Sequence, residues 1–85
     1  MDDIREAALE LIESIRNLTI AEIMKEDMIQ DIMAVEKVLC ENDDKNKVHQ
    51  IVAGLNGSMI AFLDFSKLMK PYEKWKKAVG AVLFK

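Results

Sequence analysis

The stretch AGLNGSMIA, residues 53–61, decides how many helices this chain forms. It contains an Asn-Gly pair, which is the strongest short turn signal in protein sequences. It also places Ala53, Gly57 and Ala61 four residues apart, so that in a helix these small residues would share one face. The pair is therefore either a hinge between two helices or part of the contact face of one long helix.

The positions on either side of the pair favour the long helix. A series of mainly apolar residues repeats in steps of four and three residues, as on one face of a helix, and the repeat continues through Asn56-Gly57. A two-residue turn would have no reason to preserve this repeat. The series is Val48, Val52, Leu55, Met59, Phe62, Ser66 and Met69. Two glycines and an asparagine cost a helix about 2–3 kcal/mol, and the burial of several large side chains at about 1.5–3 kcal/mol each offsets this. We predict a helix over about 45–69, with room for a bend at 54–58, and keep a hairpin at Asn56-Gly57 as the alternative.

Helical periodicity predicts the remaining elements as well. One apolar face defines a helix over about 3–17, through Ile4, Ala7, Ala8, Leu11, Ile15 and Leu18. Thr19 and Glu22 have the spacing of a capping box and predict a helix over about 20–41, whose broad apolar surface suits a central position. Pro71 is suited to the first turn of a last helix over about 71–84. The expected fold is all-α, a small antiparallel bundle of four helices forming a single domain over residues 1–85.

The size and composition of the chain limit what can stabilise it. A chain of 85 residues buries a modest core and often relies on disulfides, a metal or oligomerisation. Cys40 is the only cysteine and His49 the only histidine, so one chain cannot form a disulfide or the usual Cys/His zinc site. With 51% apolar residues, self-association or docking on a partner is the expected supplement. The lone cysteine suits a reducing, cytoplasmic compartment, and the acidic N-terminus does not resemble a signal peptide.

Charge is divided unevenly along the chain. Residues 1–47 carry 13 acidic and 6 basic side chains, whereas residues 48–85 carry 2 acidic and 6 basic ones. The two parts can attract each other within a bundle, or the basic tail can attract an anionic partner. Neither part contains a catalytic motif or an ordered set of metal ligands, and we expect no enzyme activity, no metal and no cofactor.

Two surfaces are candidates for binding. The preferred one is a protein interface around the small-residue face, formed by Ala53, Gly57, Met59, Ile60, Ala61 and Phe62. The alternative is an anionic-surface site on the basic helix 71–85 and the residue before it, formed by Lys70, Lys74, Trp75, Lys76 and Lys77. The first predicts a homodimer, adaptor or inhibitor-type regulator, and the second predicts binding to a membrane surface or, less favoured, to nucleic acid.

Overall fold

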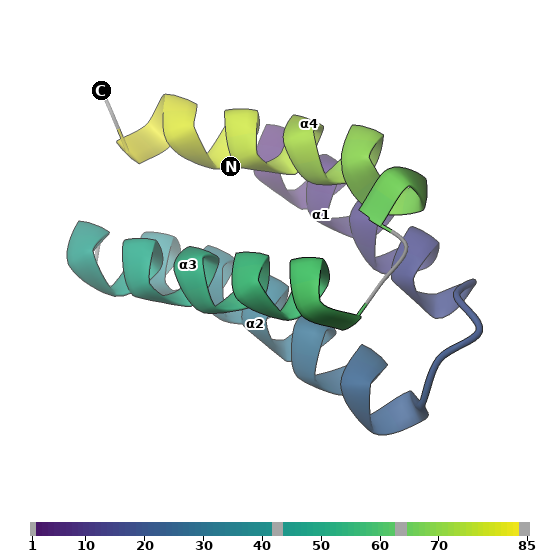
Figure 1. Cartoon of the computed structure of the whole chain (residues 1–85). Coiled ribbons are helices and arrows are strands. Elements are labelled where there is room, and N and C mark those ends of the chain that lie inside the picture. Colours follow the sequence, from purple (N-terminus) through teal and green to yellow (C-terminus); the bar gives the residue numbers. More distant parts are fainter. Residues whose placement is uncertain (1, 42–43, 63–64, 84–85) are drawn as a thin grey trace.

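Four helices follow one another in the computed structural model, which describes residues 2–41, 44–62 and 65–83. They are α1 (Asp2–Arg16), α2 (Glu22–Glu41), α3 (Lys45–Phe62) and α4 (Phe65–Leu83), and these ranges contain no strand. Each helix runs antiparallel to the next one (Figure 1). The α1–α4 contact is the most extensive, α2–α3 and α1–α2 follow, and α3–α4 is the smallest. This arrangement confirms the predicted all-α four-helix bundle.

A single apolar core fills the bundle, and every helix contributes to it. The largest fully buried side chains are Trp75, Tyr72, Ile4, Leu11, Ile15, Ile32, Leu55, Met59, Leu68, Val35 and Val48. On α1 the predicted stripe faces inward, while Glu6, Glu10 and Glu13 face solvent. Burying each large side chain contributes about 1.5–3 kcal/mol, which makes this core the main stabilising element.

The Asn-Gly pair lies inside α3, so the helix prediction for this stretch is confirmed and the hairpin is excluded. The explanation for its glycines, close approach of another helix of the same chain, is wrong. A Cβ atom added at Gly54 or Gly57 would meet nothing within 4 Å, and both residues are exposed. Asn56 has a clear role, because its Oδ1 accepts a hydrogen bond of 3.1 Å from the Tyr72 hydroxyl. This bond connects α3 to α4, the pair of contacting helices with the smallest contact in the bundle.

The boundary between the last two helices differs from the prediction of 45–69 and 71–84. The helix α3 ends at Phe62 and α4 begins at Phe65. The repeated four-three spacing continued to Met69 by coincidence, since Met69 is 49% exposed whereas its neighbour Leu68 is completely buried. A 25-residue helix would be about 37 Å long, well beyond the 15-residue α1. Because the chain turns after Phe62, α3 has 18 residues and α4 has 19, which are both close to the 20 residues of α2.

Pro71 consequently lies within α4 and not in the first turn of a last helix. Proline has no N–H to donate to the carbonyl of Lys67, and its ring crowds that carbonyl, which together cost about 3 kcal/mol. Leu68 and Tyr72 on either side of it are both completely buried. Their burial, at about 1.5–3 kcal/mol each, is sufficient to keep the segment helical.

The starts of α2 and α3 are capped in different ways. The helix α2 begins at Glu22, two residues later than expected, and the Ala21 carbonyl accepts its first backbone bonds, so Thr19 is not the capping residue. At α3, Asp44 Oδ1 accepts a hydrogen bond of 3.1 Å from the Lys47 N–H, as an N-cap carboxylate does. The short connection between α2 and α3 thus supplies the cap of α3, with its residues 42–43 outside the described ranges.

The interior position of Pro71 can be tested by replacing it with alanine. Pro71→Ala is expected to raise the free energy of unfolding by about 1–3 kcal/mol, because it restores a backbone hydrogen bond and removes a steric clash. Chemical denaturation followed by circular dichroism measures this change. A neutral or destabilising effect would instead indicate that Pro71 stands in a first helical turn, where proline is well tolerated.

Candidate interaction surface

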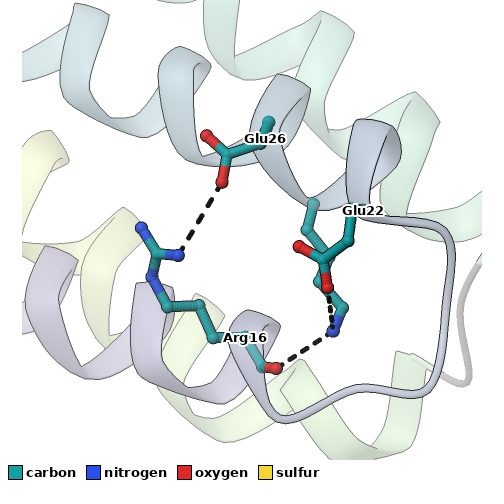
Figure 2. A network of polar contacts seen from close by, with 4 residues as sticks. Arg16, Glu22 and Glu26 are labelled. Atoms are coloured by element: carbon teal, nitrogen blue, oxygen red, sulfur yellow. Dashed lines mark hydrogen bonds and ion pairs between the residues drawn. The ribbon is translucent and has the colours of Figure 1, made fainter.

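The corner between α1 and α2 is held by a buried lysine. Lys25 is only 8% exposed, and its Nζ donates a hydrogen bond of 3.0 Å to the carbonyl oxygen of Arg16 at the end of α1. The same Nζ lies 3.4 Å from Glu22 Oε1 (Figure 2). The last carbonyls of a helix lack backbone partners, and a lysine can satisfy one of them while burying its aliphatic stem. Lys25 therefore joins the end of α1 to the first turn of α2.

Two ion pairs connect α1 to α2 on the solvent-exposed side of this helix pair. Arg16 Nη1 lies 3.7 Å from Glu26 Oε1 beside the corner (Figure 2). Arg5 Nε lies 3.1 Å from Glu36 Oε1 at the other end. In both pairs α1 supplies the arginine and α2 the glutamate. All four side chains are partly or largely exposed, so each pair contributes at most about 1 kcal/mol to stability. The pairs are therefore important mainly for the pattern of charge that they give this surface.

An apolar groove of about 390 Å³ runs between these two ends. It is lined by Arg5, Ala8, Leu9, Ile12, Arg16, Ile29, Met33 and Glu36. Ala8 and Ile29 are buried and form its floor, whereas Leu9 and Met33 are 61% and 57% exposed and form its edges. A second hollow of about 520 Å³ continues past Met33 over Ala34 and Cys40. Leu9 and Met33 are thus both exposed beside one hollow, and the flexible methionine side chain can adapt to a partner.

The residues of this groove were not among the predicted binding residues, although the sequence contains a signal for them. Arg5, Leu9, Ile12 and Arg16 follow the steps four, three and four of a second face on α1. The apolar face of α1 that packs in the core contains more apolar residues, so its periodicity hides that of this second face in the sequence. On α2 the broad apolar surface predicts a central helix, yet Met33 and Ile23 are not covered by the other helices.

The predicted protein interface on α3 is only partly a surface. Met59 is completely buried and supports the core, so it cannot form part of an exposed interface. Ala53, Gly57 and Ile60 are exposed, Ile60 by 64%. The side chains of Ala61 and Phe62 lie outside the described part of the structure.

The predicted anionic-surface residues on α4 are largely engaged within the chain. Trp75 is completely buried and stacks on Tyr72, with ring centroids 6.1 Å apart. Lys74 Nζ lies 2.8 Å from Glu10 Oε2 on α1, and this hydrogen bond raises the pKa of Lys74. Lys76 Nζ lies 3.3 Å from Glu73 Oε1 and 4.7 Å from the centre of the Tyr72 ring. Lys74 thus joins the basic part of the chain, residues 48–85, to the acidic part, residues 1–47, whereas Lys70 and Lys77 are exposed.

Tyr72 and Trp75 place polar atoms in the core next to one another. Burial, with a smaller effect from Glu73, raises the pKa of the Tyr72 hydroxyl to about 12, so it remains a hydrogen-bond donor at neutral pH. The Trp75 Nε1 is buried and has no hydrogen-bond partner among the residues that the structure describes. Both rings therefore act as structural elements of the core.

Asp27 and Asp31, four residues apart on α2, line a pocket of about 90 Å³ with Met24, Met28 and Ser58. Partial burial, and then repulsion by Asp27, raise the pKa of Asp31. Among the residues that the structure describes, no group of three His, Cys, Asp or Glu side chains is arranged to hold a metal ion.

Comparison with protein-family models, curated proteins and solved structures finds no match to this chain. Across residues 2–41, 44–62 and 65–83, none of the helices combines the length and apolar character needed to cross a membrane.

Replacing Lys25 tests whether it holds the corner. Lys25→Met keeps the aliphatic volume but leaves the Arg16 carbonyl without this donor, and we expect the free energy of unfolding to fall by about 1–2 kcal/mol. The exposed Lys70→Met is the control and should change stability by less than about 0.5 kcal/mol. If both substitutions have the same effect in urea titrations, Lys25 does not hold the corner.

Proposed function

We propose that this protein is a non-enzymatic helical module that acts by protein–protein contact, as a homodimer, adaptor or inhibitor-type regulator. Its interaction surface is the α1–α2 groove. The observation that carries the proposal is the exposure of Leu9 and Met33 beside this groove, between the Arg5–Glu36 and Arg16–Glu26 pairs. An apolar centre with a charged rim is the common anatomy of a protein-binding patch.

The small size of the chain supports the same proposal. The four helices cover the main apolar stripe of α1 but leave Leu9 at the surface and Ile12 only partly buried. An uncovered apolar groove gains free energy when another polypeptide fills it, at about 25 cal/mol for each Å² removed from water. As Cys40 is the only cysteine in the sequence, we also propose that the protein acts in a reducing, cytoplasmic compartment.

The alternative of an anionic-surface binder is less supported by the geometry. Trp75 would have to leave the core to stack on a base or enter a membrane interface. Lys74 would have to exchange its contact with Glu10 for a phosphate. Lys70 and Lys77 remain exposed, but two lysines provide a weak electrostatic site.

Affinity capture from the native host with matched baits tests the proposal. The wild-type chain and Ile60→Glu should retain the same partner, because Ile60 lies on α3, away from the groove. Leu9→Glu should lose that partner, since it places a charge in the apolar groove. Titration calorimetry with the purified partner should then show a loss of affinity of about tenfold or more for Leu9→Glu alone.

Equal binding by Leu9→Glu and wild type would contradict the assignment of the groove. Tight binding of the wild type to anionic vesicles at low salt, abolished in Lys70→Glu/Lys77→Glu, would contradict the proposal in favour of the alternative.

A further inference from the structure

We infer that the α1–α2 groove binds the same groove of a second copy of this chain, about a two-fold axis parallel to the helices. The inference rests on the proposed function and specifies its partner. It is based on the order of charged and apolar side chains along the two helices, which makes this face complementary to itself.

The two helices carry matching patterns of opposite charge. On α1 the order is Arg5, Leu9, Ile12, Arg16, and on α2 the antiparallel order is Glu36, Met33, Ile29, Glu26. Each helix therefore has an apolar centre between two like charges, positive on α1 and negative on α2. The intrachain distances of 3.1 Å for Arg5–Glu36 and 3.7 Å for Arg16–Glu26 show that the two patterns are in register.

Symmetry then determines which dimer this pattern favours. A two-fold axis parallel to the helices places α1 of one copy over α2 of the other. Arg5 of one copy then faces Glu36 of the other, Arg16 faces Glu26 in the same way, and Leu9 comes over Met33. At each end two arginines and two glutamates alternate around a square. An axis perpendicular to the helices would instead place α1 over α1, and Arg5 would face Arg16, which is repulsive.

The extent of the face indicates the strength of the dimer. The 15 residues of α1 span about 22 Å, and two adjacent helices are about 20 Å wide, so the pair of copies would bury on the order of 900 Å². Stable interfaces usually bury about 1,200 Å² or more. We therefore expect a reversible dimer that dissociates on dilution.

Sedimentation equilibrium of the full chain tests the dimer and its location. The wild type should dimerise at high micromolar concentration and dissociate on dilution, and Ile60→Glu should behave in the same way. Leu9→Glu and Met33→Glu should each weaken the dimer by about tenfold or more, because each introduces a charge into the apolar centre. Both positions are more than half exposed, and circular dichroism should show that both variants keep the helical fold.

Exchanging the charges tests the orientation. The variant Arg5→Glu/Arg16→Glu/Glu26→Arg/Glu36→Arg keeps both intrachain pairs and should also form homodimers. Mixed with the wild type, it should not form heterodimers, because like charges would then meet at both ends. The two chains have the same composition, so one is labelled with ¹⁵N and the species are separated by native mass spectrometry.

A wild type that stays monomeric at high micromolar concentration would overturn the inference, as would a dimer that Leu9→Glu leaves intact. Preferential heterodimers in the mixture would overturn the parallel axis. If the wild type is monomeric but Leu9→Glu still abolishes capture of a different protein, the inference fails and the proposed function stands. If Leu9→Glu affects neither measurement, both fail.

Discussion

The hydrogen bond from Lys25 Nζ to the Arg16 carbonyl is the contact on which the α1–α2 surface depends. It joins the end of α1 to the first turn of α2, and the two helices run antiparallel from this corner. Their register brings an arginine of α1 opposite a glutamate of α2 at both ends of the groove. A shift of one residue along α2 would rotate Met33 by about 100° around the helix and remove it from the groove edge. The corner thus acts together with the buried core residues of α1 and α2 to hold the register that gives the surface its charge pattern.

Away from this surface, the chain uses its charges internally. The contact of 2.8 Å between Lys74 and Glu10 joins the basic residues 48–85 to the acidic residues 1–47 across the α1–α4 contact, the largest helix contact in the bundle. The Tyr72 hydroxyl and Asn56 make the corresponding connection across the smallest one. The α1–α2 face, by contrast, presents exposed apolar side chains between two ion pairs to solvent.

The sequence was sufficient to predict the fold class, the number of helices and the course of the chain through Asn56-Gly57, because a continuous apolar phase outweighs two glycines. It misplaced the α3–α4 boundary, since Met69 continued the spacing although Leu68 is the residue that packs in the core. It also assigned Met59 and Trp75 to surfaces, because periodicity shows which residues share a face but not which face is covered. The groove was missed for the same reason. Arg5, Leu9, Ile12 and Arg16 share a helical face in the sequence, but only the packing of α2 beside it reveals a hollow with paired charges at its ends.

Contact between the α1–α2 faces of two copies can be detected by isotope-filtered nuclear Overhauser measurements. In a concentrated mixture of labelled and unlabelled chains, we expect intermolecular effects between the methyl groups of Leu9 in one copy and Met33 in the other. Intermolecular effects that involve Ile60 of α3 in place of Leu9 and Met33 would contradict it, as would a concentrated sample with no intermolecular effects at all.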